Sequence, residues 1–247
     1  MDDELGFSQP LGLSLGDDDI ADEYSDYLLL KRALQNEKAA PELLPYEDEL
    51  IQRINALLEH QVRVHLIIQY HYPNTNPHKH LHLHQEQVVQ SAESRPDHDL
   101  VCTIYTVEIT RVKYMLRSYL RTRLFKIGKY VMHSMDDPEV RSRLSPLEDQ
   151  YAEQYLRLIG NHLANTVSAK LPEAFKSVFK QASAHQANDM IPAPDLGTHV
   201  FTNILRDLGQ VQVYEDGSSQ EMFKGDTYIM RYAMLRRLLQ DGSVQLM

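Results

Sequence analysis

The sequence predicts a mainly α-helical protein that ends in a small β-rich domain. Three observations indicate this. Apolar residues recur at steps of three and four through most of the chain before residue 172, which is the period of an amphipathic helix. Residues 145–148 (SPLE) have the form of a helix capping box. After about residue 193 the pattern changes to short runs separated by turn residues, which is typical of strands.

Length and composition restrict the class of protein. A chain of 247 residues with 43% hydrophobic residues can bury one large core or two small ones. The single cysteine, Cys102, cannot form an internal disulfide, and there is no cysteine pair to hold zinc. The N-terminus is acidic, and no apolar run approaches 18 residues. We therefore expect a soluble intracellular protein with no signal peptide or membrane anchor.

The net charge of −10 is unevenly distributed. Residues 1–49 carry 14 acidic and 3 basic side chains, a net charge of −11, and the remainder carries 21 acidic and 22 basic side chains. The acidity therefore belongs to the N-terminal part, and the rest of the chain is nearly neutral. A dedicated nucleic-acid-binding protein normally has a basic surplus, so this balance argues against direct DNA contact.

The first part of the chain is predicted to contain a tail, two helices and an insertion. Residues 1–23 are glycine-containing and acidic, and we expect them to be a disordered tail. Ser25 can cap a short helix that runs to Leu34, and a second helix is expected from about 47 to 68. Residues 70–98 contain three prolines and many histidines, so they are interpreted as a loop or insertion.

The longest helix is predicted over residues 103–133. Its apolar residues form one continuous stripe at steps of three and four, namely Ile109, Val112, Leu116, Leu120, Leu124, Ile127 and Val131.

The same helix carries seven cations: Arg111, Lys113, Arg117, Arg121, Arg123, Lys126 and Lys129. Lys113, Arg117 and Arg121 are four residues apart and form a row. Contact with a partner or pairing within the chain is favoured over direct DNA contact. The candidate partner-binding residues on this helix are Arg117, Arg121 and Arg123.

A further helix is expected to begin at Pro146, with Ser145 as its N-cap and Glu148 completing the capping box. It should end before Pro172, and a short helix over residues 173–180 follows. Its predicted apolar stripe consists of Leu147, Tyr151, Tyr155, Leu158 and His162.

The sequence divides the folded chain into a helical domain at 24–185 and a β-rich domain at 193–247, joined by a linker at 186–192. Few contacts are expected to cross a linker with these prolines, so the two domains should be separable. In the second domain we expect strands at 199–205, 210–214, 226–230 and 243–247, a turn at 216–219 and a helix at 233–239.

The histidine-rich insertion contains His71, His78, His80, His82 and His84. Alternating histidines on an extended segment can bind zinc or copper. No cysteine or well-placed carboxylate lies nearby, so a polar insertion is favoured over a metal site.

Signatures of catalysis are absent from the sequence. There is no glycine-rich phosphate loop, no G-x-S-x-G elbow and no H-E-x-x-H pair. We expect a protein that is not an enzyme and that needs no cofactor.

Several stretches together resemble the Sld-five family of GINS subunits, GINS being a four-subunit eukaryotic replication complex. They are residues 36–44 (NEKAAPELL), the long-helix segment 108–130, the capped segment 144–155, and, near the C-terminus, residues 194–196, 200–201 and 242–246. The resemblance covers about residues 24–247. The sequence departs from the family in having no tryptophan before Asn36 and in carrying the histidine-rich insertion.

The resemblance implies a helical A domain and a small β-rich B domain. It also implies a non-catalytic adaptor subunit in the nucleus, in a hetero-tetramer with the Psf-one, Psf-two and Psf-three subunits. GINS joins the MCM ring and the Cdc-forty-five protein in the CMG helicase, which acts in initiation and elongation of DNA replication. The alternative is a stand-alone nucleic-acid or metal-binding module that uses the basic helix and the histidines.

The acidic tail contains a second candidate binding segment, formed by Asp18, Asp19 and Ile20. It resembles a short peptide with which some fungal relatives bind a replisome hub, the Ctf-four protein. Ala21 stands where that peptide has a leucine.

Overall fold

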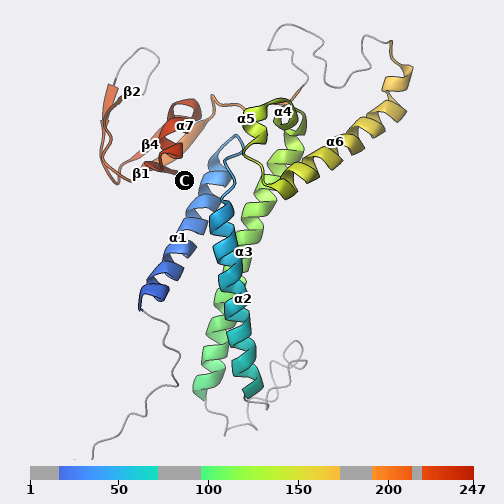
Figure 1. Ribbon diagram of the computed structural model, residues 1–247. Coiled ribbons are helices and arrows are strands. Elements are labelled where there is room, and N and C mark those ends of the chain that lie inside the picture. Colours follow the sequence, from blue (N-terminus) through green and yellow to red (C-terminus); the bar gives the residue numbers. More distant parts are fainter. Residues whose placement is uncertain (1–16, 72–95, 173–190, 213–218) are drawn as a thin grey trace, which may run out of the picture.

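The computed structural model has a stem of long helices with a small sheet domain on one side of its upper end and a diverging helix on the other (Figure 1). It describes residues 17–71, 96–172, 191–212 and 219–247.

The helices of the stem are α1 (Asp17–Ala39), α2 (Asp48–His71) and α3 (Pro96–Lys129). Beyond the stem follow α4 (Val131–Asp136), α5 (Pro138–Arg141), α6 (Pro146–Thr166) and the short 3₁₀ helix η1 (Ser168–Lys170). The fold class predicted from the sequence is confirmed: a helical bundle precedes a small antiparallel sheet.

Helix α1 begins earlier than the sequence predicted. It starts at Asp17 instead of after Ser25, so the prediction of a disordered tail is wrong for residues 17–23. Residues 1–16 lie outside the described part of the chain.

The histidine-rich insertion is shorter than predicted. Helix α2 continues to His71 and α3 already begins at Pro96, so residues 70–71 and 96–98 are helical. Pro96 is tolerated at the first position of a helix, where its missing N–H has no intrahelical partner to lose. Residues 72–95, and with them most of the insertion, lie outside the described residues, as does the helix predicted at 173–180.

The core of the stem is formed by apolar side chains that α1, α2 and α3 direct toward one another. The buried residues are Leu30, Leu34, Leu50, Ile51, Ile54, Leu58, Ile109, Met115, Leu116 and Tyr119. The predicted stripe of α3 is therefore largely confirmed. Leu124 is the exception, at 37% exposure, because at that level α3 turns charged side chains inward instead of apolar ones.

Helix α6 has the predicted capping box. The Ser145 hydroxyl accepts from the Glu148 backbone N–H at 3.3 Å, and the Glu148 carboxylate accepts from the Ser145 N–H at 3.0 Å. The predicted apolar stripe, however, is mostly not the packed face: of its residues, Tyr155 packs against a buried cluster, whereas Leu147, Tyr151, Leu158 and His162 are exposed. Leu147 and Leu158 are 78% and 66% exposed, whereas Ala152 is fully buried. The helix diverges from the stem (Figure 1), and the side that packs, with Ala152, Leu156 and Ile159, is a different side from that of Leu147 and Leu158.

The C-terminal domain contains two small antiparallel sheets and one helix. The elements are β1 (His199–Ile204), β2 (Gly209–Gln212), β3 (Ser219–Met222), β4 (Thr227–Arg231), α7 (Tyr232–Gln240) and β5 (Val244–Leu246). One sheet has the order β4-β1-β5, and β2 pairs with β3. Strand β3 was missed because its sequence, SQEM, has no apolar alternation. Most of the predicted turn at 216–219 lies outside the described residues.

The two domains share a packed boundary, which contradicts the expectation that few contacts connect them. Ala40, at the end of α1, is part of the buried cluster of the C-terminal domain. The Leu246 N–H donates to the Asn36 Oδ1 at 2.9 Å, and Gln245 donates to Gln35 at 2.6 Å. The sequence could not indicate this contact, because the pairs are separated by 210 residues.

Replacement of Ser145 by alanine removes the N-cap of α6. We expect a loss of about 1 kcal/mol in the free energy of unfolding, measured by urea denaturation, because a backbone N–H at the helix start loses its acceptor. Thr166→Ala at the other end of α6 is the matched control, since its exposed hydroxyl only bonds back to the His162 carbonyl. Equal effects of the two substitutions would contradict the assignment of Ser145 as a stabilising cap.

Candidate functional site

Residues 36–44 form the junction at which α1, α3, α6 and the C-terminal domain meet. Helix α1 ends at Ala39, and Pro41 and Pro45 prevent the chain from continuing as a helix. Within this junction Glu37 and Glu42 are buried. A buried carboxylate is costly unless it is paired, so these two residues require cations from other elements.

Arg123 of α3 supplies the first of these cations and has no exposed surface. Its Nε and Nη2 donate to the two carboxylate oxygens of Glu148 at 2.7 and 2.9 Å, and its Nη1 donates to Glu37 at 3.2 Å. The remaining donors reach the carbonyls of Leu44 and Arg143. Burial alone would lower the pKa of Arg123, but the hydrogen bonds and charge of Glu148, together with Tyr119 and Glu37, raise it above its ordinary value.

Lys126 lies one turn further along the same face of α3. Its Nζ donates to the Glu37 carboxylate and to the Glu42 carbonyl, both at 2.8 Å, and also to the Glu37 carbonyl. Burial lowers the pKa of Lys126, and the adjacent Glu37 carboxylate partly opposes that effect. The lysine thus holds the junction through both side-chain and backbone oxygens.

Glu42 carries the network into the C-terminal domain. Its carboxylate accepts from Arg143 at 2.9 Å, from the Tyr232 hydroxyl at 2.8 Å and from Arg236 at 2.9 Å. Tyr232 and Arg236 belong to α7, so a single buried carboxylate joins the two domains. Glu139 accepts from Arg236 at 3.0 Å and also pairs with Arg143.

The network is electrically balanced. Its four cations and four carboxylates are Arg123, Lys126, Arg143 and Arg236, and Glu37, Glu42, Glu139 and Glu148. We call these eight side chains the junction network.

The sequence placed Arg123 among the partner-binding residues, and this prediction is wrong, because the side chain is fully buried. The helical period could have indicated the error. Arg123 is three residues from Leu120 and four from Ile127, so it lies on the same face as these two residues of the predicted apolar stripe. Arg117 and Arg121 are exposed, as a partner-binding role requires.

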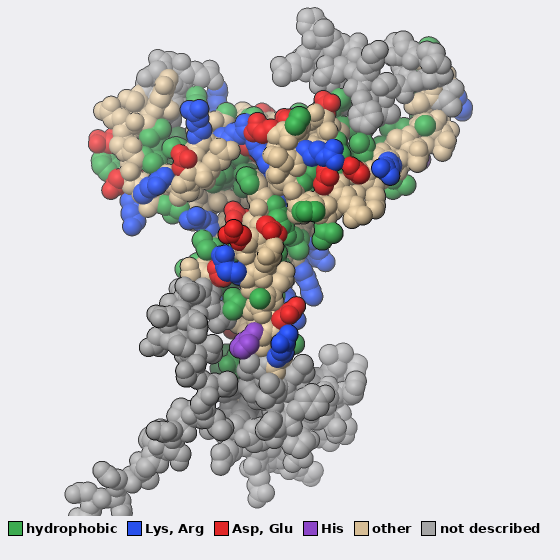
Figure 2. All heavy atoms as spheres, in the orientation of Figure 1, with side chains coloured by type: hydrophobic (Ala, Val, Ile, Leu, Met, Phe, Trp, Pro, Cys, Tyr) green, Lys and Arg blue, Asp and Glu red, His purple; other side chains and the backbone are tan. Residues whose placement is uncertain are grey.

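Arg117 and Arg121 lie with Lys113 along a shallow groove on the outer side of α3. Figure 2 shows Lys and Arg side chains projecting from the edge of the stem. Within the described part of the chain, no ion pair involves any of the three cations of this row. The other residues of the groove are Thr110, Tyr114, Ser118, Thr122 and Phe125.

Apolar side chains are exposed on the same outer side of α3 and on α6. Leu100, Ile104 and Val107 are more than half exposed near the start of α3. Leu147 and Leu158 are similarly exposed on α6. Each of these groups of large exposed apolar residues is typical of a surface that another protein covers.

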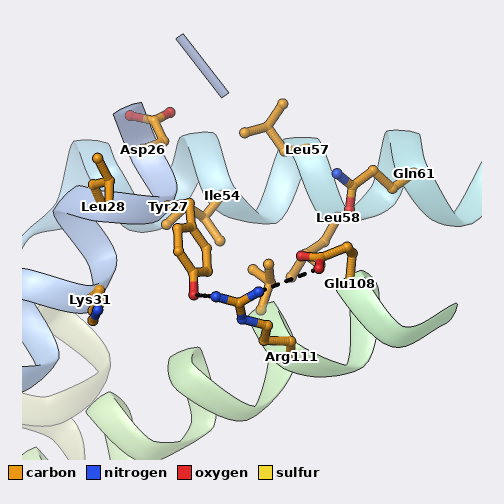
Figure 3. Close-up of a pocket in the computed structure, with 11 residues that line it drawn as sticks. Asp26, Tyr27, Leu28, Lys31, Ile54, Leu57, Leu58, Gln61, Glu108 and Arg111 are labelled. Atoms are coloured by element: carbon orange, nitrogen blue, oxygen red, sulfur yellow. Dashed lines mark hydrogen bonds and ion pairs between the residues drawn. The ribbon is translucent and has the colours of Figure 1, made fainter. Parts of the chain in front are cut away.

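A pocket of about 530 Å³ opens between α1, α2 and α3. Its floor is apolar, and the Arg111 guanidinium lies at its edge, where it donates to the Tyr27 hydroxyl and pairs with Glu108 at 3.4 Å (Figure 3). The apolar lining consists of Leu28, Ile54, Leu57, Leu58 and Val112.

The remaining predicted sites are not brought together. Asp18, Asp19 and Ile20 lie in the first turn of α1, and the structure does not describe their side chains. His71 ends α2, and the other four histidines of the insertion lie outside the described residues. Among the residues that the structure describes, no three His, Cys, Asp or Glu side chains could hold a metal ion together. No described helix is both long and apolar enough to span a membrane.

Replacing Arg123 with alanine should destabilise the isolated chain by about 3–5 kcal/mol, because Glu37 and Glu148 would remain buried with too little positive charge. Arg121→Ala, two residues away on the exposed side of α3, should change the free energy of unfolding by less than about 0.5 kcal/mol. Chemical denaturation of both variants measures the difference. Similar stabilities for the two would show that the junction network does not stabilise the fold.

The pKa of Tyr232 is raised above its ordinary value of 10.0 by burial, and then by the charge and hydrogen bond of Glu42. The folded protein keeps this proton at a pH at which the unfolded chain releases it, so stability present below pH 10 is lost as the pH rises further. As the pH rises above 10, the free energy of unfolding should therefore fall more steeply in the wild type than in Tyr232→Phe. The difference between the two slopes should be up to about 1.4 kcal/mol per pH unit. The exposed Tyr114→Phe is the control and should follow the wild-type slope.

Comparison with known proteins places this architecture in a family. Residues 50–167 match the GINS complex protein helical bundle domain, and residues 194–247 match the C-terminus of the DNA replication complex GINS protein SLD5. The protein of that name from Arabidopsis thaliana is 34% identical over 225 residues, which cover 90% of this chain and 91% of the relative. The human protein of that name is 27% identical, over 88% of this chain and 86% of the relative. This chain therefore belongs to the SLD5 family of GINS complex proteins.

Proposed function

We propose that this protein is a non-catalytic structural subunit of a GINS complex, and that it acts in DNA replication by holding other subunits. The observation that carries the proposal is the set of large apolar side chains that are exposed on α6 and near the start of α3. Leu147 and Leu158 are 78% and 66% exposed on the side of α6 that does not pack against the buried cluster of Ala152. Burying such side chains against another subunit contributes about 1.5–3 kcal/mol each.

The junction network supports a scaffolding role. It fixes the direction in which α6 leaves the stem, because Arg123 binds Glu148 in the first turn of α6. It also fixes the C-terminal domain through Glu42. A subunit that binds partners through α3, α6 and the C-terminal domain needs these three parts in a constant relative orientation.

The resemblance of the sequence to the family extends the proposal to specific partners. We assign this chain to a hetero-tetramer with the Psf-one, Psf-two and Psf-three subunits in the nucleus. This complex would join the MCM ring and the Cdc-forty-five protein in the CMG helicase, where initiation and elongation both require it. The ATPase work belongs to the MCM ring, so this chain needs no catalytic residue or cofactor.

The sequence at the start of α1 carries a second proposal about partners. Asp18, Asp19 and Ile20 would bind a replisome hub such as the Ctf-four protein. Ala21 replaces a leucine that would otherwise be buried, so a single peptide should bind only weakly. Binding to a trimeric hub would then depend on several contacts at once.

The alternative, a stand-alone nucleic-acid or metal-binding module, has less support. Two of the seven cations of α3, Arg123 and Lys126, are consumed in the junction network, and the net charge of the chain is −10. Both features oppose a strong attraction for phosphates.

The apolar surface of α6 can be tested by substitution. The double substitution Leu147→Asp and Leu158→Asp should abolish recovery of this chain with the other three GINS subunits when all four are co-expressed. The isolated variant should stay folded, because exposed positions usually change stability by less than about 0.5 kcal/mol. Co-purification and circular dichroism measure the two effects.

The matched control is Ala164→Asp, at an exposed position about 100° around α6 from Leu147. It should be recovered with the other subunits as efficiently as the wild type. Full recovery of the double variant would mean that α6 is not the binding surface.

A further inference from the structure

Helix α3 contains a long acid-free segment in an otherwise acidic protein. Between Ile109 and Met135 the sequence has seven lysines and arginines and no aspartate or glutamate. A helix of this composition cannot neutralise its charges through neighbours three or four residues away. Its cations must therefore be paired by other elements, by aromatic rings or by something outside the chain.

The structure accounts for four of the seven cations. Arg123 and Lys126 bind carboxylates of the junction network. Arg111 pairs with Glu108, which precedes the acid-free segment. The ammonium group of Lys129 lies 4.9 Å from the centre of the Tyr130 ring, which is a cation–π distance.

The three remaining cations are the row Lys113, Arg117 and Arg121. They are spaced four residues apart, so successive side chains emerge about 6 Å apart along one side of the helix. In the part of the chain that the structure describes, no carboxylate lies within ion-pair distance of them. Like charges at this spacing repel one another, so the row destabilises the isolated helix slightly.

Two aromatic side chains adjoin the row in the same groove. Tyr114 and Phe125 are 67% and 71% exposed, which is unusual for residues of their size. Together with Val107 and Arg121 they follow the spacing of a helical seam, since the steps from Val107 to Phe125 are seven, seven and four residues. The outer side of α3 thus combines exposed aromatic side chains with a row of positive charges.

We propose that this row binds an acidic amphipathic helix of a partner subunit, whose carboxylates recur about every fourth residue and whose apolar side chains contact Tyr114 and Phe125. The inference rests on the proposed function and specifies the chemistry of one partner. Charge complementarity would align the partner along α3 and fix its register, because a shift by two residues would leave its carboxylates away from the three cations.

A single-stranded nucleic acid fits this surface less well. Tyr114 and Phe125 are eleven residues apart, so they lie about 16 Å apart along the helix axis. Stacking platforms for nucleic acids place aromatic rings against successive bases. The apolar continuation through Leu100, Ile104 and Val107 also suits a helix better than a sugar–phosphate chain.

The test compares two variants of the full-length chain that lose the same charge. One carries Lys113→Gln, Arg117→Gln and Arg121→Gln. The control carries Arg63→Gln, Lys170→Gln and Lys224→Gln, all exposed and away from the row. Each chain is co-expressed with the other three GINS subunits, the complex is immobilised through a tag on one of those subunits, and release of this chain is measured at rising NaCl concentration.

We expect the row variant to be released about tenfold more readily than the wild type at about 0.1 M NaCl, because three exposed ion pairs are lost together. The difference should shrink as salt screens the wild-type pairs. The control variant should match the wild type. Thermal unfolding of the isolated row variant should occur at the wild-type temperature or above, since self-repulsion is removed; a purely structural role for the row would lower it.

A second measurement identifies the groups that face the row. A zero-length carbodiimide should couple the Lys113 amine to an aspartate or glutamate of another subunit in the assembled complex. Arg117→Lys and Arg121→Lys should give additional links to carboxylates one and two turns further along the same partner helix. Mass spectrometry of the linked peptides reads the spacing directly.

Identical release curves for the wild type and the row variant would overturn the inference while leaving the proposed function intact. A second result would also overturn the inference, in favour of a nucleic-acid site. In this result, the wild type and the control variant bind a fluorescent oligothymidine tightly, the row variant does not, and the other subunits retain all three chains equally. A wild-type chain that the other subunits do not retain contradicts the proposed function, and the inference falls with it.

Discussion

The buried contact of Arg123 with Glu37 and Glu148 is the constraint on which the rest of the architecture depends. One guanidinium joins the end of α1, the middle of α3 and the start of α6. Burying these charges is costly, and the cost is offset because every donor of the guanidinium meets an oxygen at good distance. The relative positions of α1, α3 and α6 are thereby restricted, because a small displacement of one helix would leave a buried charge unpaired. An apolar core at this point would tolerate more rearrangement.

The same network decides how the two domains are joined. Glu42 follows Glu37 by five residues and binds both residues of the helical domain and α7 of the C-terminal domain. Ala40 packs in the buried cluster of the C-terminal domain, and Asn36 accepts a hydrogen bond from the backbone of β5. Residues 36–44 (NEKAAPELL) therefore contact both the helical domain and the C-terminal domain. A loop could connect two domains flexibly, but this segment carries one buried carboxylate at the end of α1, Glu37, and a second in the loop that follows, Glu42, and both are bound by other elements. The charges of the junction therefore serve orientation more than binding.

Helix α3 separates its cations into two functional groups. On the inner side, Arg123 and Lys126 are neutralised within the chain, whereas Lys113, Arg117 and Arg121 remain on the outer side without carboxylates among the described residues. The exposed leucines of α6 have the same character, since the chain leaves them uncovered. A subunit of a larger assembly is expected to be incomplete in this way, with a saturated interior and unsatisfied outer surfaces.

The sequence by itself determined the fold class, the capping box at Ser145, the apolar stripe of α3 and the order of most strands, because these features depend on local period and capping chemistry. Strand β3, the buried state of Arg123 and the packing of Ala40 against the C-terminal domain were decided only in the tertiary structure. The reason is physical: whether a cation or an apolar face is buried depends on which elements approach it. In this chain those partners lie up to 210 residues away. Periodicity reveals that α6 has an apolar side, but only the path of the helix away from the stem leaves Leu147 and Leu158 of that side exposed.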